Sequence, residues 1–443
     1  MQVRLRQLTD RVLNRFFAIP MLFVVLGALL SLLVRAVDSG DAAESLPTAM
    51  QTTVESGRVL LATIAGGLLT SVTLLLSLML VAVQLASTQY SPRTLRNWIG
   101  DKTLQITVGV VLGTSVFCLL VLRDTRRLSE ATADTPATEL VPHIGVLVAV
   151  VLGIVSLILV VKSVDHLADS LRVGRVGQRI MAATLSTIEH RSSVAGGEGD
   201  ARSPVVPPGA ATGQPEPEAP VPDEAEPVTT PIAGWVQQID IEALLAALPS
   251  GSTAWIAAPL GNYVLPDAPL VWTTADTTDC EHGIRDAFAL GDTRTMQQDA
   301  AYGILRLTDI AVRALSPGVN DPNTAADMVA HLNVILLRLW ELPPEAGRHR
   351  SDDRTVILTP VSHEAYLHLA LDPIRRYGAT DPVVIETLVR ALTQLAAEVE
   401  RRDLPGPTEP IAEMAELVRS TADRTLFSPQ DRERLDGATD RRS

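Results

Sequence analysis

Apolar runs that lack Asp, Glu, Lys and Arg dominate the first part of this chain, whereas charged residues are spread through the remainder. Four such runs cover residues 16–34, 59–85, 104–122 and 141–161. A transmembrane helix needs about 20 mostly apolar residues, because each residue adds roughly 1.5 Å across a hydrocarbon layer of ~30 Å. The pattern therefore predicts a four-helix transmembrane domain over residues 1–161.

Basic residues in the short flanks of these runs predict their orientation. They gather before the first run, in the second connection and after the fourth run: Arg4, Arg6, Arg11, Arg15, Arg93, Arg96, Lys102, Lys162, Arg172, Arg175 and Arg179. The first connection is instead mostly acidic. Because Lys and Arg are enriched in cytoplasmic flanks, both termini are expected in the cytoplasm. The lipid bilayer is the first expected partner.

Polar residues inside the runs raise the question of transport. The centres of the runs hold no carboxylate, Lys or Arg. Such groups usually mark proton relays and ion paths, so a charge-relay transporter is disfavoured. An oligomeric channel lined by Thr70, Thr73, Ser77 and Gln84 of the second run stays open as an alternative. The competing interpretation is that hydroxyls in a spanning helix bond the backbone of their own helix.

Small residues recur in two of the runs at a spacing that lets helix backbones approach closely. Gly109 and Gly113 do so in the third run, and Gly145, Ala149 and Gly153 in the fourth. They fit packing within one four-helix bundle, and they also fit packing between the subunits of a homo-oligomer.

The periodicity changes after residue 161. Residues 162–191 are expected as a cytoplasmic helix, and residues 192–231 are rich enough in Pro, Ala, Gly and Glu to predict a disordered linker. Residues 232–275 then form a small β-rich unit. Its expected elements are strands at 235–239, 253–257, 262–265 and 270–272 and a helix at 241–247. Their order resembles half of the small barrels that carry biotin or lipoate.

Helical periodicity dominates residues 276–427, and a charged tail occupies residues 428–443. The later helices are expected at 362–377, 381–401 and 408–425. The fold class is therefore a membrane α-helical domain of four transmembrane helices plus a cytoplasmic α+β domain. That second domain is expected to contain a small β-barrel-like unit followed by a mostly helical unit.

Composition excludes several chemistries. A net charge of −14 argues against a nucleic-acid partner, which needs clustered basic residues. Lys102 and Lys162 are the only lysines, so the cytoplasmic part lacks an amine for a Schiff base, a phosphate loop or a biotin carrier. The two cysteines offer no disulfide framework. His363 and His368 point ~140° apart around a helix, which does not suit a zinc pair. No cofactor or metal is expected.

The most distinctive stretch covers residues 294–325 and predicts two helices joined by a turn. Ser316–Gly318 ends the first helix, and Asp321 before a proline caps the second. The candidates for binding a ligand or partner are Arg306, Asp309, Arg313, Ser316, Asn320 and Asp321. Two interpretations are open. Either the arginines and the second helix start hold an anionic ligand or an acidic partner segment, or the charged stripe forms ion pairs within its own helix.

Three segments carry a resemblance to a known family. They are YSPRTLRNWIGDKTLQITVGVVLGTSVFCLLVLR at residues 90–123, GWVQQID at 234–240 and RTMQQDAAYGILRLTDIAVRALSPGVNDPNTA at 294–325. With these motifs the chain resembles the bacterial membrane-protein family called domain of unknown function 2254. The resemblance implies a multi-pass protein of the bacterial inner membrane. It implies no activity, because the family is named for lacking a known one.

Three functions stay open at this point. The leading hypothesis is a membrane-anchored oligomeric scaffold or sensor whose cytoplasmic domain binds an unknown ligand or protein near residues 316–321. The second is an oligomeric channel lined by the second transmembrane helix. The third is a membrane-bound enzyme of unknown reaction, which is disfavoured because the sequence shows no pairing of a nucleophile with a base and no metal cluster.

Overall fold

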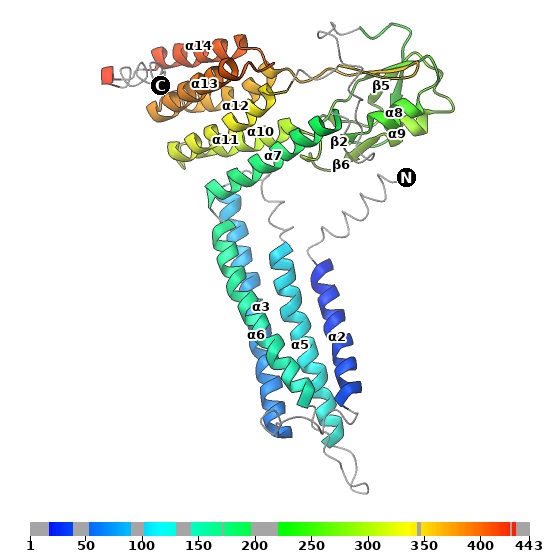
Figure 1. Cartoon of the computed structure of the whole chain (residues 1–443), viewed down its shortest axis with the longest axis vertical. Coiled ribbons are helices and arrows are strands. Elements are labelled where there is room, and N and C mark those ends of the chain that lie inside the picture. Colours follow the sequence, from blue (N-terminus) through cyan, green and yellow to red (C-terminus); the bar gives the residue numbers. More distant parts are fainter. Residues whose placement is uncertain are drawn as a thin grey trace. The chain divides into compact units, whose positions relative to one another are not determined.

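The computed structural model describes residues 17–38, 53–89, 102–129, 143–170, 172–195, 220–342, 347–425 and 428–430. The chain divides into two compact units, Met1–Arg172 and Val173–Ser443, here called the first unit and the second unit (Figure 1). The basic flanks before residue 17 and in the second connection, the middle of the expected linker and most of the charged tail lie outside the described residues.

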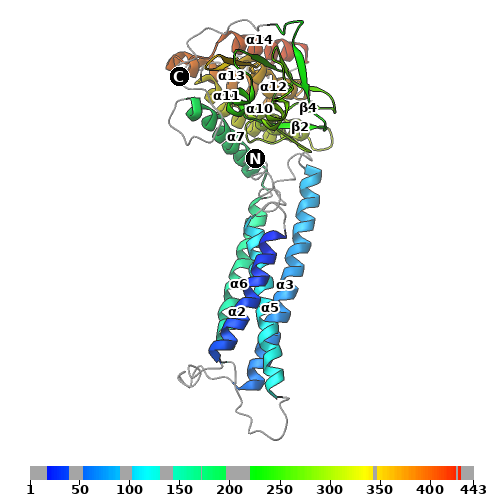
Figure 2. The same cartoon turned by 90° about the vertical axis from the view of Figure 1, so that its right-hand side faces the viewer.

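The first unit is built from long apolar helices. They are α2 (Ala18–Asp38), α3 (Val54–Gln89), α5 (Lys102–Ser129) and α6 (His143–Ser170). Each holds a segment long and apolar enough to cross a membrane: Ala18–Val37, Glu55–Gln84, Lys102–Asp124 and His143–Asp169. The prediction of four helices that are long and apolar enough to be candidate spans is confirmed. Figure 2 shows the four helices lying side by side, and α5 packs against each of the other three.

Close backbone contacts hold the first unit together. A Cβ atom added to Gly27 of α2 would lie 2.2 Å from the carbonyl oxygen of Gly113 in α5, and one added to Gly113 would lie 2.5 Å from the carbonyl oxygen of Phe23. On α6, a Cβ on Gly153 would lie 3.3 Å from Ile64 of α3. Gly113 and Gly153, two of the small residues predicted to permit close approach, therefore do so within one chain.

Buried hydroxyls fix the alignment of α5 and α6. The Ser163 hydroxyl donates to the Thr107 hydroxyl at 2.7 Å, and the Ser156 hydroxyl donates to that of Thr114 at 3.2 Å. Both pairs are seven residues apart on each helix, as expected for two antiparallel helices in a single register. Polar pairs of this kind satisfy hydroxyls that lipid cannot hydrate.

The second unit contains two sheets. Its strands are β1 (Glu226–Thr229), β2 (Gly234–Ile239), β3 (Thr253–Ile256), β4 (Tyr263–Val264), β5 (Pro269–Thr273), β6 (Phe288–Gly291), β7 (Arg348–Ser351) and β8 (Arg354–Ile357). One sheet has the order β1-β5-β3-β8-β7 and the other β4-β2-β6. All pairings are antiparallel except β3 with β8. Within the described residues neither sheet closes, so the prediction of a barrel-like unit is wrong.

Long-range pairing explains this error. The strand β8 adds in parallel to β3, with Ala254 opposite Val356, and β7 then forms an open edge. Both β7 and β8, like β6, lie in the stretch expected to be helical, and β1 lies in the stretch expected as linker. One apolar core is shared by both sheets and by α8 (Ile241–Ala247) and α9 (Glu281–Asp286), with Val236, Leu244, Val271, Ile284 and Val356 among its buried residues.

The remaining helices form the rest of the second unit. They are α7 (Val173–Ala195), α10 (Ala300–Ala314), α11 (Pro322–Trp340), α12 (His363–Tyr377), α13 (Pro382–Arg402) and α14 (Glu409–Arg424). The helix expected over residues 162–191 is instead divided: α6 continues to Ser170, and α7 packs on α10 and α11. A Cβ on Gly303 would lie 2.0 Å from the Thr184 hydroxyl, so α7 and α10 nearly touch.

Candidate functional site

The turn between α10 and α11 has a defined backbone. The amide of Asn320 donates to the Ser316 carbonyl at 2.9 Å, and that of Asp321 donates to the Ala314 carbonyl at 2.8 Å. The Ser316 hydroxyl donates to the Arg313 carbonyl at 2.7 Å. Asn320 has a φ of 51°, in the left-handed region that Asn tolerates better than most residues. The turn therefore presents Val319 and Asn320 outward in one conformation.

Asp321 begins α11, as the sequence predicted. Its carboxylate accepts hydrogen bonds from the Thr324 amide at 3.1 Å and the Thr324 hydroxyl at 2.6 Å. These bonds hold the pKa of Asp321 below its usual value. The carboxylate occupies the position that an anionic ligand would take at this helix start. An anion at the turn would therefore depend on Arg313 rather than on the backbone of α11.

Arg306 lies apart from the turn. Its side chain is only 3% exposed, and its Nη1 lies 3.6 Å from the Met296 sulfur. Among the residues that the structure describes, its Nε has no hydrogen-bond partner. Burial lowers the pKa of the Arg306 guanidinium, against the opposing effects of Tyr302 and Asp309. A ligand on the surface cannot reach this group directly.

The six predicted residues thus do not form one site. Arg306 is enclosed, whereas Arg313, Ser316, Asn320 and Asp321 meet at the turn, and Asp309 and Arg313 are half-buried. The charged side chains along α10 do not form one surface, because Met296 of the loop before α10 covers Arg306.

Sequence reasoning missed the contacts made by that loop, residues 292–299. The Gln237 side chain donates to the Thr293 carbonyl at 2.6 Å, and the Ile239 amide donates to the Gln298 side chain at 3.0 Å. The Thr187 hydroxyl of α7 donates to the Met296 carbonyl at 2.8 Å. The loop therefore joins β2, α7 and α10. The two glutamine pairs, in GWVQQID and RTMQQD, were the sequence feature from which contact between these two segments could have been predicted.

An ion pair at the same loop reinforces this junction. The Arg294 Nε donates to the Asp299 carboxylate at 2.5 Å, and Asp299 also accepts from the Tyr302 amide at the start of α10. Gly261, with a φ of 77°, passes so close that a Cβ there would lie 2.5 Å from both side chains. Arg294 and Asp299, both in the distinctive stretch 294–325, therefore bind each other and the start of α10.

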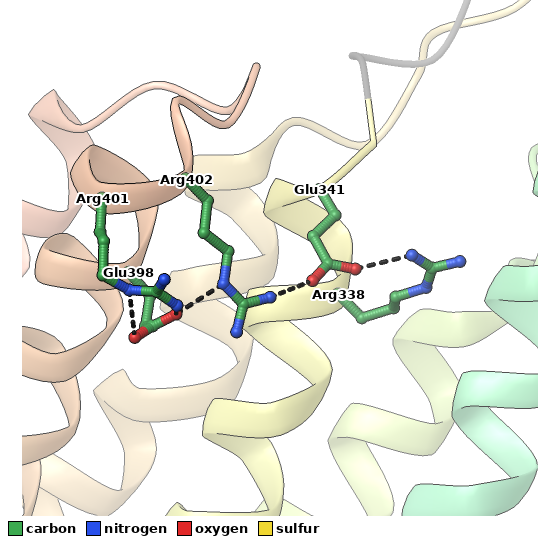
Figure 3. Close-up of polar contacts among 5 residues, drawn as sticks. All are labelled: Arg338, Glu341, Glu398, Arg401 and Arg402. Carbon is green, nitrogen blue, oxygen red and sulfur yellow. Dashed lines mark hydrogen bonds and ion pairs between the residues drawn. The ribbon is translucent and has the colours of Figure 1, made fainter.

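A second charged cluster joins the ends of α11 and α13 (Figure 3). Arg402 lies between two glutamates, with Nη1 2.9 Å from Glu341 and Nε 2.6 Å from Glu398. Arg338 pairs with Glu341 at 2.6 Å, and Arg401 pairs with Glu398 at 2.5 Å. The positive charges of these arginines are stabilised near the C-terminal ends of helices, where the helix dipole is negative. The Arg401 hydrogen bond is the main cause that lowers the pKa of Glu398.

The pore candidates lie on the outer side of α3. Thr70, Thr73, Ser77 and Gln84 are exposed in the single chain. The Thr70 and Thr73 hydroxyls donate to the carbonyls of Gly66 and Leu69, each at 3.0 Å. This is the backbone bonding that the alternative interpretation expected, and the channel stays a prediction.

The two histidines of the false zinc motif have different surroundings. The His363 ring nitrogen Nε2 lies 3.1 Å from the Leu339 carbonyl, and its ring meets Trp340 edge-on at 4.8 Å. His368 is exposed and lies 3.9 Å from Glu364. In the described part of the chain, no group of three or more His, Cys, Asp or Glu side chains could hold a metal ion.

Comparisons with known proteins agree with the membrane character of the first unit. A family model described as "Predicted membrane protein (DUF2254)" matches residues 14–394. An uncharacterised protein of Mycobacterium bovis is 27% identical over 431 residues, covering 94% of this chain and 77% of the relative. An uncharacterised protein of Mycobacterium tuberculosis shows the same identity and coverage. No solved structure matches the chain.

Proposed function

We propose that this chain, which belongs to the DUF2254 family of predicted membrane proteins, is a membrane-anchored scaffold or sensor. Its second unit would bind a partner protein at the turn between α10 and α11. The supporting observation is the position of α7, which follows the last candidate span, ending at Asp169, after only three residues and packs on both α10 and α11.

Tight contacts make α7 suited to transmit a change at the turn. Gly303 of α10 leaves no room beside Thr184, and a Cβ on Gly177 would lie 2.6 Å from the Met328 side chain of α11. Closely packed helices shift together or not at all, because their interfaces do not deform continuously. A partner that moves the α10–α11 pair would therefore move α7 and pull on α6 through the short connection.

The exposed part of the turn suits a protein partner. Val319 is 49% exposed and lies beside Asn320, whose amide can both donate and accept. Exposed turns held by a rigid scaffold are common recognition sites. The anionic alternative depends on Arg313, which is half-buried.

Photo-crosslinking in cells tests this surface. A photoreactive phenylalanine analogue at Val319 should give a discrete crosslinked product, and the same analogue at Val383, an exposed valine on α13, should not. Asn320→Gly keeps the left-handed backbone available and removes only the amide, so it should lower the yield several-fold. Arg313→Ala should lower it as well if an acidic segment is bound.

The mass of the product separates the outcomes. A band at twice the mass of the chain supports a scaffold of identical copies, and a different mass supports a separate partner. Equal and diffuse labelling at Val319 and Val383 would contradict the proposal.

The proposal places the second unit in the cytoplasm of a bacterial cell, with the spans in its inner membrane. The native cysteines can report on this, since Cys118 is buried among the spans and Cys280 is half-buried in the second unit. A membrane-impermeant maleimide should label inverted vesicles and leave right-side-out vesicles unlabelled. Mildly alkaline buffer is needed because burial raises the Cys280 pKa.

Cys280→Ser is the control for that experiment, because it should abolish the labelling of inverted vesicles. Labelling of right-side-out vesicles alone would place the second unit outside the cell.

A further inference from the structure

An exposed apolar patch lies on the outer face of the β2–β4 pair. Ile232, Tyr263 and Leu265 are 56%, 53% and 63% exposed. Trp235 stands opposite Tyr263 in the strand register, and their rings meet edge-on at 5.4 Å. These four residues are called the aromatic patch below. Large apolar side chains that gather on one surface usually mark an interaction site.

Backbone hydrogen bonds hold the patch in place. The Val236 amide donates to the Asn262 carbonyl at 2.9 Å, and the Asp267 amide donates to the Thr230 carbonyl at 2.7 Å. Side chains alternate along these segments, so Val264 points inward while Tyr263 and Leu265 point outward. The exposed side chains are thus fixed by a ladder whose other face belongs to the core of the second unit.

The segments that form the patch are free of charge. Residues 227–239 and 243–266 contain no Asp, Glu, Lys, Arg or His, although the chain has a net charge of −14. An acidic protein is repelled by the anionic headgroups of a cytoplasmic leaflet. The exposed Asp267 borders the patch, so the part of this face that can approach such headgroups without that repulsion is the patch side chains themselves.

We propose that the aromatic patch rests on the surface of a lipid bilayer. The chain carries four candidate spans of its own, so a bilayer is always within reach of the second unit. Trp and Tyr favour the boundary between hydrocarbon and water, and Leu and Ile add apolar area that enters it. A second copy adding to the sheet is a poorer fit, because the edge strand β4 has only two residues.

Spin labelling of the full-length protein in nanodiscs of phosphatidylcholine and phosphatidylglycerol tests the proposal. The label is attached to Leu265→Cys in a background with Cys118→Ser and Cys280→Ser, and Val383→Cys serves as an exposed control of similar kind. Oxygen concentrates in lipid, whereas a nickel chelate stays in water. The label at 265 should collide with the chelate several-fold less often than the label at 383, and more often with oxygen.

A label at Ile232→Cys repeats the measurement from the neighbouring strand end. Chelate collisions at 265 and 232 that equal those at 383 would overturn the proposal. Dipolar broadening between labels at 265 would also overturn it, because a second copy would then cover the patch. Neither result depends on the turn between α10 and α11, so this proposal and the proposed function fail separately.

Discussion

Single residues decide where helices start, and Asp321 gives a measurable case. The Thr324 hydrogen bonds lower its pKa in the folded protein. The carboxylate therefore stabilises the fold above its unfolded pKa of about 3.9, and this contribution disappears as the pH falls through the folded pKa. We expect Asp321→Ala to lower the free energy of unfolding by about 1 kcal/mol near neutral pH. The loss should become smaller at acidic pH, where the protonated carboxyl still accepts a hydrogen bond but no longer carries a charge.

Denaturant unfolding of the full-length protein at several pH values measures this difference. Asp321→Asn is the matched control, because an amide still caps the helix but cannot titrate. It should keep most of the neutral-pH stability and lose the pH-dependent part. A loss for Asp321→Ala that is equal at every pH would contradict the assignment.

Residue-scale predictions from sequence succeed where the physics is local. Asp321 before Pro322 predicts a helix start, and the start lies there. The burial of Arg306 could not be predicted in this way, because it depends on Met296, which lies in the loop before α10. A charged residue at helical spacing looks the same in sequence whether that face meets solvent or another segment.

At the scale of elements, the contact between α7 and α10 leaves the least room for a larger side chain. A Cβ on Gly303 would lie 2.0 Å from the Thr184 hydroxyl. We expect Gly303→Ala to destabilise the second unit by about 1–3 kcal/mol, as overpacked interfaces do. Thr184→Ala should remove the hydroxyl and methyl contacts but leaves its own Cβ 2.9 Å away, so the double variant should recover only part of the loss.

A double-mutant cycle measured by thermal unfolding gives the coupling between the two positions. Gly318→Ala is a control, because a Cβ there meets nothing within 4 Å. Additive effects of Gly303→Ala and Thr184→Ala would show that the two helices are not in close contact.

Elements with a strong local pattern could be predicted closely. The helix expected at 241–247 is α8, and the one expected at 381–401 is α13, displaced by one residue at each end. The strands β7 and β8 were not predicted, because RHRS and RTVI are short and lack the apolar alternation of a buried strand. β8 is a strand because it pairs with β3, and β7 is a strand because it pairs with β8.

At the scale of the whole molecule, the four spans followed from hydrophobic length alone, since lipid demands it. The barrel-like unit, by contrast, was predicted from only four strands and one helix at residues 232–275, and this prediction is wrong. Its expected edge is taken up by β8, a hundred residues further along the chain. The junction at residues 292–299 escaped prediction for the same reason, because Gln237 of β2 donates to its Thr293 carbonyl and its Gln298 side chain accepts from the Ile239 amide of β2.

The parallel pairing of β3 with β8 also sets the order in which this protein can be assembled. During synthesis β3 leaves the ribosome long before residues 354–357 exist, so its outer edge must wait unpaired while α10 and α11 are made. Contacts between distant segments form slowly and leave strand edges open in the meantime. A growing chain of this protein is therefore most prone to aggregate in the interval between β5 and β8, after its spans have already been delivered to the membrane.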